Sequence, residues 1–305
     1  MRIVFMGTPE FAVPSLKKLI ADGHEIVGVF TQPDKPKNRG MKLTPSPVKV
    51  VAIEHDIPVY QPTTLKNDEP YEALTALAPE LIVVAAYGKI LPKRILDLPP
   101  KGCINVHSSL LPRYRGAAPI NWAILNGETE TGVTIMYMAE GLDTGDIISQ
   151  RATPIDPNET VEALHDRLAD IGAELLGETV YAIDAGTAAR IPQDDAKSCY
   201  APMLSRELSP IDFSRSAREI HNQVRGLIPW PATTVEIKGE TIKIFAVEET
   251  DQVSDESAGT WLGADKKGIN VVCGDGRVLR ILELQAPGKK RMRAVDYLRG
   301  HALFD

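Results

Sequence analysis

The stretch that decides the fold is Met1–Phe30, which has the sequence MRIVFMGTPEFAVPSLKKLIADGHEIVGVF. Met1–Met6 is a short apolar run that ends at Gly7, and a helix-like pattern of apolar residues follows until Gly23. Glu25–Phe30 is the next apolar run. A strand, a turn, a helix and a second strand in this order predict a parallel sheet that is covered by helices.

The same alternation of strands and helices continues as far as Ala185. Ser46 and Pro47 are typical of a helix N-cap and first turn, and they predict a helix that ends at Glu54. The remaining elements of this part are expected as strands at residues 58–60, 81–86, 103–107, 132–138 and 147–155, and as helices at residues 70–78, 119–126 and 160–185.

The pattern changes after residue 185. Residues 186–210 contain Pro192, Pro202 and Pro210 with little periodicity, which indicates a linker or an extended crossing segment. A helix is expected at 214–225, and short strand-like runs with Gly and Asp turns follow at 233–238, 241–247, 268–273 and 278–285. We therefore predict an α/β chain with a Rossmann-like parallel-sheet domain at 1–190, a linker at 191–206 and a smaller OB-like β-barrel domain at 207–305.

The composition indicates an ordinary globular protein of a reducing compartment. The chain has 305 residues, 43% hydrophobic and 25% charged, and a net charge of −7, which argues weakly against a nucleic-acid binder. Cys103, Cys199 and Cys273 are far apart and odd in number, so neither a disulfide framework nor a thiolate metal site is expected. No leader peptide, apolar membrane span or metal-ligand spacing is found, and we expect a cytoplasmic, metal-free monomer.

The turn after the first strand does not have the pattern of a dinucleotide-binding loop. That fingerprint needs three glycines, G-x-G-x-x-G, and the segment Gly7–Phe11 contains only the first of them. A Walker loop is also absent from the sequence. The simpler interpretation is that Gly7 permits a tight turn between strand and helix.

Three polar residues form the strongest candidate for a catalytic site. Asn105 and His107 lie two residues apart at the carboxyl end of the strand predicted at 103–107, so both side chains point to the same face. Ligands of open parallel sheets bind at this end of the strands, and a long irregular loop follows. Asp143 lies between two glycines in the segment 141–146, and only the fold can bring it to His107.

These residues carry a resemblance to a known family. The segment NVHSSLLP at 105–112, RGAAP at 115–119 and GLDTG at 141–145 together resemble the signature of the folate-dependent formyltransferases. FTQPD at 30–34 and SPVK at 46–49 are similar to the branch of this family that acts on methionyl-tRNA. One departure is Ser108, because the residue after the histidine is commonly glycine in the family.

The resemblance implies attack by a primary amine on the formyl carbon of the co-substrate 10-formyltetrahydrofolate. Asn105 would donate a hydrogen bond to the resulting oxyanion, and His107 would either donate to the same oxygen or transfer protons. Asp143 would hold the imidazole in one tautomer and favour its protonated form. The resemblance also places the folate against the loop that contains Ser109, Leu110, Leu111 and Pro112.

Two clusters of basic residues are candidates for binding initiator methionyl-tRNA. The first is a local positive loop in which only Asp34 is acidic, and its basic residues are Lys35, Lys37, Arg39 and Lys42. The resemblance places this loop in the acceptor stem, with Arg39 at the position of an important arginine. The second cluster lies near the C-terminus and consists of Lys289, Lys290, Arg291 and Arg293. Basic groups of this kind suit contacts to nucleic-acid phosphates.

Three other functions remain as alternatives. A formyltransferase for a sugar-nucleotide amine or a ribonucleotide amine would carry the same three site residues. A 10-formyltetrahydrofolate hydrolase would need no large acceptor surface. A non-catalytic nucleic-acid binder would leave Asn105, His107 and Asp143 without a role. The three residues thus indicate the reaction, whereas the acceptor is inferred from the basic loop and the second domain.

Overall fold

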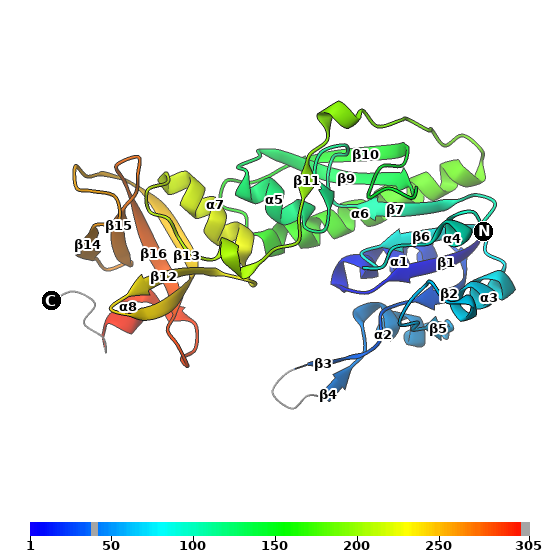
Figure 1. Cartoon of the computed structure of the whole chain (residues 1–305), viewed down its shortest axis with the longest axis horizontal. Coiled ribbons are helices and arrows are strands. Elements are labelled where there is room, and N and C mark those ends of the chain that lie inside the picture. The colour runs from blue at the N-terminus through cyan, green and yellow to red at the C-terminus, as the bar shows by residue number, and fades with distance from the viewer. Residues whose placement is uncertain (38–41, 300–305) are drawn as a thin grey trace. The chain divides into compact units, whose positions relative to one another are not determined.

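The computed structural model of the chain describes residues 1–37 and 42–299. The chain divides into two compact units (Figure 1). The first unit consists of Met1–Pro119, Glu130–Pro154 and His165–Ala201. The second unit consists of Ile120–Thr129, Ile155–Leu164 and the chain from Pro202 onward. No helix in the described ranges is long and apolar enough to cross a membrane.

The first unit is built on a sheet that has seven strands in the described residues. Their spatial order is β10-β9-β7-β6-β1-β2-β5, which confirms the Rossmann-like expectation for the N-terminal part (Figure 1). The strands are β1 (Arg2–Gly7), β2 (Glu25–Phe30), β5 (Val59–Tyr60), β6 (Leu81–Ala85), β7 (Cys103–His107), β9 (Glu130–Tyr137) and β10 (Ile147–Pro154). The five residues of β6 are all buried, as expected for a central strand of a covered sheet.

The direction of one strand, β9, differs from the expected parallel sheet. β7, β6, β1, β2 and β5 pair in parallel, whereas β9 runs antiparallel to both β7 and β10. Apolar runs predict where strands lie but not the direction from which the chain enters them. The sheet is therefore mixed, and its antiparallel edge lies beside the strand that carries Asn105 and His107.

Helices cover both faces of this sheet. The helices of the first unit are α1 (Val13–Ala21), α2 (Pro47–Glu54), α3 (Asp68–Leu77), α4 (Lys93–Leu96) and the greater part of α6 (Val161–Asp184). The predicted cap of α2 is confirmed, because the Ser46 hydroxyl accepts a hydrogen bond from the backbone N–H of Lys49 at 3.1 Å. Thr160 caps α6 in the same way, through the backbone N–H of Ala163 at 3.3 Å.

The basic loop contains a short hairpin that the sequence did not predict. β3 (Lys35–Lys37) pairs with β4 (Lys42–Thr44), and Arg39 lies outside the described residues. At the base of the hairpin, the hydroxyls of Thr31 and Ser46 lie 2.6 Å apart, and both residues are buried. This contact joins the two chain segments that lead into and out of the hairpin.

The second unit contains an antiparallel sheet, which confirms the expected β-rich C-terminal part. Its strands pair in the order β12-β13-β16-β15-β14, and β17 adds to β16. Their bounds are Thr233–Ile237 (β12), Glu240–Val253 (β13), Trp261–Ala264 (β14), Ile269–Val272 (β15), Arg277–Gln285 (β16) and Met292–Arg293 (β17). Its α-helices are α5 (Pro119–Leu125), of which Pro119 belongs to the first unit, the first residues of α6, α7 (Ala217–Leu227) and α8 (Ala294–Leu298).

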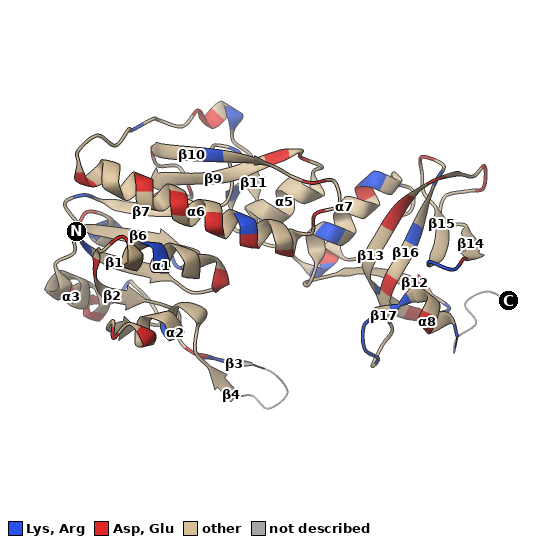
Figure 2. Ribbon diagram, turned by 180° about the vertical axis from the view of Figure 1, so that it is seen from behind, with Lys and Arg blue, Asp and Glu red and all other residues tan. Residues whose placement is uncertain are grey.

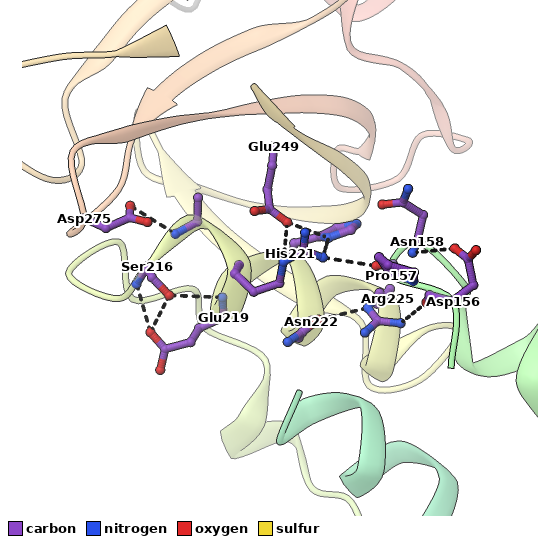
Figure 3. A network of polar contacts seen from close by, with 12 residues as sticks. Asp156, Pro157, Asn158, Ser216, Glu219, His221, Asn222, Arg225, Glu249 and Asp275 are labelled. Atoms are coloured by element: carbon purple, nitrogen blue, oxygen red, sulfur yellow. Dashed lines mark hydrogen bonds and ion pairs between the residues drawn. The ribbon is translucent and has the colours of Figure 1, made fainter. Parts of the chain in front are cut away.

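Helix α7 carries buried polar side chains as well as apolar ones (Figure 3). Arg225 is only 5% exposed, and its guanidinium donates to Asn222 Oδ1 at 3.0 Å and to the carbonyl oxygens of Glu159 at 2.8 Å and Asp156 at 3.2 Å. A buried charge is tolerated when its donors are satisfied in this way. Arg225 therefore fastens α7 to the segment that precedes α6.

His221 lies in the same network and is 6% exposed (Figure 3). Its Nδ1 lies 3.1 Å from Glu249 Oε1, and Arg218 contacts the same carboxylate at 2.8 Å. Despite the nearby carboxylate, burial and the charges of Arg218 and Arg225 lower the pKa of His221 from 6.5 to about 4. The imidazole is therefore neutral in the folded protein at pH 7.

This shift predicts a loss of stability in mild acid. The pKa of His221 is lower in the folded protein than in the unfolded chain, so the unfolded chain binds a proton more readily between pH 6.5 and pH 4. The free energy of unfolding therefore decreases as the pH drops through that window. The difference corresponds to about 2 kcal/mol between pH 7 and pH 5. Urea unfolding at both pH values should show that His221→Gln loses less stability than the wild type on acidification.

The exposed His55 supplies the matched control. His55→Gln should keep the wild-type difference between pH 7 and pH 5. If His221→Gln and His55→Gln behave alike, the acid sensitivity does not arise from His221.

Candidate active site

The alternation of side chains along β7 places the candidate site on one face of the sheet. Val106 faces α6, because a Cβ atom added at Gly172 of that helix would lie 3.0 Å from Val106 Cγ1. Asn105 and His107 are its neighbours in the strand, so they point to the opposite face. In the pairing of β7 with β9, Asn105 lies beside Met136 and His107 beside Thr134.

His107 is 5% exposed and is fixed by a main-chain group. Its Nε2 lies 2.9 Å from the carbonyl oxygen of Tyr114. Because a carbonyl can only accept, Nε2 carries the hydrogen and donates it. Nδ1 is the remaining ring nitrogen, and it lies 3.7 Å from Asp143 Oδ2. The ring is therefore oriented by Tyr114 and presents Nδ1 to the carboxylate.

The fold brings Asp143 to His107 across a long stretch of sequence. Its carboxylate accepts a hydrogen bond from the backbone N–H of Gly116 at 2.8 Å, and its side chain is 15% exposed. The 3.7 Å to His107 Nδ1 exceeds a direct hydrogen bond, and the two groups would attract each other as charges only when Nδ1 also carries a proton. The loop after Asp143 is tight, because a Cβ at Gly145 would lie 1.8 Å from the carbonyl oxygen of Tyr137.

Asn105 differs from His107 and Asp143 because its side chain makes no hydrogen bond within the described residues. The residue is half-buried. The strand therefore presents an amide donor on the same face of the sheet as His107, whose ring faces Asp143. Such a donor suits an oxygen on which negative charge develops during a reaction.

The loop after β7 is held by buried hydroxyl groups. Ser109 is fully buried, and its hydroxyl donates to the carbonyl oxygen of Arg113 at 2.7 Å. The hydroxyl of Thr134 donates to the carbonyl oxygen of Ser109 at 2.6 Å and accepts from the backbone N–H of Leu111 at 3.1 Å. Leu111 is 3% exposed and packs on Met136, so its side chain anchors the loop.

The other two residues of the predicted folate loop are more accessible. Leu110 and Pro112 are half-buried, and Leu110 leans on β9, since a Cβ at Gly132 would lie 2.6 Å from Leu110 Cδ2. A ligand at this loop would meet Leu110, Pro112 and main-chain groups rather than the side chains of Ser109 and Leu111. No group of three or more His, Cys, Asp and Glu residues that could hold a metal is found in the described residues.

The basic candidates lie in both units. In the first unit, Lys35 is exposed on β3, and Lys37 and Lys42 are paired through their backbones in the hairpin. In the second unit, Figure 2 shows basic residues gathered at the turn before β17. Lys289 and Lys290 are exposed in this turn.

The arginines beside that turn have different environments. Arg293 is exposed at the end of β17. Arg291 donates from Nε to Glu283 at 2.6 Å, and its guanidinium lies 4.8 Å from the centre of the Phe245 ring. Within the part of the chain that the structure describes, the second cluster thus combines three basic side chains without an ion-pair partner and one arginine, Arg291, that is held by a carboxylate and an aromatic ring.

Sequence reasoning missed three groups that shape the site. The carbonyl of Tyr114 orients His107, the backbone N–H of Gly116 holds the Asp143 carboxylate, and the side chain of Gln193 reaches the Asp143 loop. Main-chain groups leave no signature in a sequence. Gln193 lies in the proline-containing stretch that was expected to be a linker or a crossing segment, and nothing in that stretch singled it out.

Comparison with known proteins assigns both parts of the chain to related families. Residues 1–180 match the formyl transferase family, and residues 203–302 match the formyl transferase C-terminal domain family. The methionyl-tRNA formyltransferase of Trichlorobacter lovleyi is 51% identical over 302 residues, covering 99% of this chain and 95% of that protein. The enzyme of the same name from Clostridioides difficile is 52% identical, covering 99% of this chain and 98% of the relative.

Solved structures of more distant proteins share the fold. WlaRD, a sugar 3N-formyl transferase crystallised with dTDP and 5-N-formyl-THF, superposes with a TM-score of 0.71 at 22% identity, covering 95% of this chain and 99% of that chain. An N-formyltransferase from Helicobacter canadensis, in complex with folinic acid and dTDP-3-aminofucose, also gives a TM-score of 0.71 at 22% identity, with 93% and 98% of the two chains covered.

Proposed function

This chain belongs to the formyl transferase family, and we propose that it transfers the formyl group of 10-formyltetrahydrofolate to the amino group of initiator methionyl-tRNA. The observation that carries the proposal is the set of relatives named methionyl-tRNA formyltransferase, which are about 50% identical over nearly the whole length of both chains. The sugar formyltransferases match at only 22% identity and share the fold. The product would be N-formylmethionyl-tRNA, which is used to initiate translation.

The folate co-substrate supplies the activated formyl group, and the chain offers groups that suit it. The uncommitted amide of Asn105 can donate to the formyl oxygen as negative charge develops there. The half-buried Leu110 and Pro112 offer apolar contact beside it. No metal-binding group is needed for this role, because a preorganised amide donor stabilises the charge directly.

His107 and Asp143 are assigned to the proton that the attacking amine must lose. The Nε2 hydrogen of His107 is already donated to the carbonyl of Tyr114, so only Nδ1 is left for chemistry. A proton that arrives at Nδ1 would face Asp143 Oδ2 at 3.7 Å, and the carboxylate would stabilise the resulting cation. We therefore infer a division of roles. Asn105 would stabilise the oxyanion, and the His107–Asp143 pair would accept the proton of the amine and pass it to folate N10 as the N10–formyl bond breaks.

A competition between acceptors tests the function. The purified protein is supplied with 10-formyltetrahydrofolate labelled in the formyl group, together with methionyl-tRNA and a sugar-nucleotide amine. We expect the label on methionyl-tRNA. Label on the sugar amine alone would assign the chain to the sugar branch, and label released only as formate would assign it to the hydrolases.

The role of the second unit is tested by reversing charges at the turn before β17. Lys289→Glu with Lys290→Glu should weaken tRNA binding by about 10-fold or more at physiological salt, and it should reduce the slope of log affinity against log salt by about 2, because two phosphate contacts are lost. Filter binding of tRNA over a range of salt concentrations measures both quantities.

Two consecutive lysines of the turn between β14 and β15 provide a matched control. Lys266 and Lys267 are also exposed, and Lys266→Glu with Lys267→Glu makes the same change in net charge. This control should keep a larger share of the affinity and of the salt slope. Equal losses in the two double variants would show that tRNA senses the total charge and not the turn before β17.

A further inference from the structure

The segment that follows the first unit's last long helix is anchored at both of its ends. At one end, Ile191 and Ile147 exchange backbone hydrogen bonds of 2.9 and 3.0 Å. At the other end, β11 (Tyr200–Ala201) pairs in parallel with β8 (Arg115–Gly116). Gln193 lies between these two anchors, so its backbone is held close to the Asp143 loop.

The side-chain amide of Gln193 makes four hydrogen bonds, two from its nitrogen and two to its oxygen. Its Nε2 donates to the carbonyl oxygens of Asp143 and Gly145, at 2.8 Å each. Its Oε1 accepts from Arg115 Nε at 3.0 Å and from Arg115 Nη2 at 2.8 Å. A guanidinium can only donate and a carbonyl can only accept, so the amide has one possible orientation.

The contacts close a ring around Asp143. Arg115 holds Gln193, Gln193 holds the main chain of Asp143, and the backbone N–H of Gly116 holds the Asp143 carboxylate. Arg115 and Gly116 are neighbours in β8, so this short strand closes the ring of contacts. The ring also supports Asp143 in a left-handed backbone conformation, with a φ of 52°, which non-glycine residues rarely adopt.

We propose that Gln193 and Arg115 are positioning residues of the transfer reaction. They act by holding the Asp143 loop so that its carboxylate faces His107 Nδ1, and they do not themselves contact the substrates. A carboxylate that is displaced by even about 1 Å can lower a rate by about 10²-fold. The proposal rests on the function assigned to Asp143 above, and it adds two residues from outside the motif's three catalytic positions.

The solvent-facing end of the ring contributes little to this role. Arg115 also pairs with Asp195 at 2.7 Å, but the Asp195 side chain is 82% exposed, whereas that of Arg115 is 12% exposed. Exposed ion pairs stabilise by little, because water and salt screen them. The part-buried hydrogen bonds between Arg115, Gln193 and the Asp143 loop are therefore the ones that hold the loop in place.

Two substitutions of Gln193 distinguish its hydrogen bonds to Arg115 from its hydrogen bonds to the Asp143 loop. Gln193→Leu removes all four hydrogen bonds. Gln193→Glu keeps the acceptor for Arg115 but places a carboxylate against the carbonyls of Asp143 and Gly145. Both variants should lower kcat by about 10²-fold, with the KM values for folate and methionyl-tRNA changed by less than about threefold. Gln252→Leu, at an exposed glutamine of β13, is the matched control and should keep wild-type kinetics.

A double-mutant cycle with Asp143→Asn shows whether Gln193 acts through Asp143. If it does, Gln193→Leu should change the remaining rate by less than about threefold once the carboxylate is gone. The same loss in both backgrounds would overturn the proposal and leave Gln193 with a general structural role. A wild-type kcat in both Gln193 variants would overturn it as well.

Amide hydrogen exchange separates this proposal from the proposed function. Gln193→Leu should speed exchange in the segment that contains Asp143 and Gly145, and Gln252→Leu should not. If the wild type formylates methionyl-tRNA but Gln193→Leu alters neither rate nor exchange, the positioning role is wrong and the function stands. If Gln193→Leu accelerates amide exchange in this segment but the wild type formylates no amine, Gln193 does hold the Asp143 loop and the proposed function is wrong.

Discussion

Asp143→Asn is expected to lower kcat for formyl transfer by about 10³–10⁴-fold while the protein remains folded. The size of the effect follows from removing the charge that stabilises a protonated imidazole, as in other sites where a carboxylate faces a histidine. The fold should tolerate the change, because the amide oxygen of asparagine can still accept the 2.8 Å hydrogen bond from Gly116 N. The KM values should change much less than kcat.

A neighbouring carboxylate of the same loop is the control for this prediction. Asp146 is followed directly by β10, and its side chain lies 3.7 Å from Arg190, away from the His107 contact. Asp146→Asn should keep kcat within about threefold of the wild type, because an exposed ion pair contributes little. If the two variants have equal rates, Asp143 does not have the catalytic role assigned here.

Asn105→Ala is expected to lower kcat by about 10²–10³-fold, because one oxyanion donor typically contributes about 3–4 kcal/mol to the transition state. Asn105→Asp should be at least as slow, because it keeps the shape but replaces the donor with a negative charge beside the developing oxyanion. Steady-state formylation assays of both variants measure these effects.

The stability of the same variants provides the control. The Asn105 amide makes no hydrogen bond within the described residues, so Asn105→Ala should unfold within about 1 kcal/mol of the wild type. A variant that transfers formyl groups at the wild-type rate would remove Asn105 from the mechanism. A variant that is slow only because it is unfolded would be recognised by its denaturation curve.

Much of the fold could be predicted from the sequence because its signals are local. Ser46 before Pro47 has the chemistry of a helix start, and the five buried residues of β6 have the pattern of a central strand. Spacing by two along β7 also correctly places Asn105 and His107 on one face. The antiparallel direction of β9 could not be predicted, because it depends on the path of the chain between strands.

The side chains of the candidate site could be singled out in the sequence, whereas the groups that hold them in place could not. The motif residues Asn105, His107 and Asp143 are polar groups with recognisable roles, and the fold brings His107 and Asp143 within 3.7 Å. Their supports are a carbonyl of Tyr114 and the side chain of Gln193, which is held between two distant anchors. Such contacts depend on tertiary structure, so a single sequence contains no signal for them.

The balance between the two products of the wild-type reaction tests the proposed formyl transfer most directly. With labelled 10-formyltetrahydrofolate and methionyl-tRNA, the protein should form tetrahydrofolate and N-formylmethionyl-tRNA in equal amounts, and it should release no tetrahydrofolate when methionyl-tRNA is left out. Tetrahydrofolate that appears at the same rate without methionyl-tRNA would contradict the proposed transfer, because water would then be the acceptor.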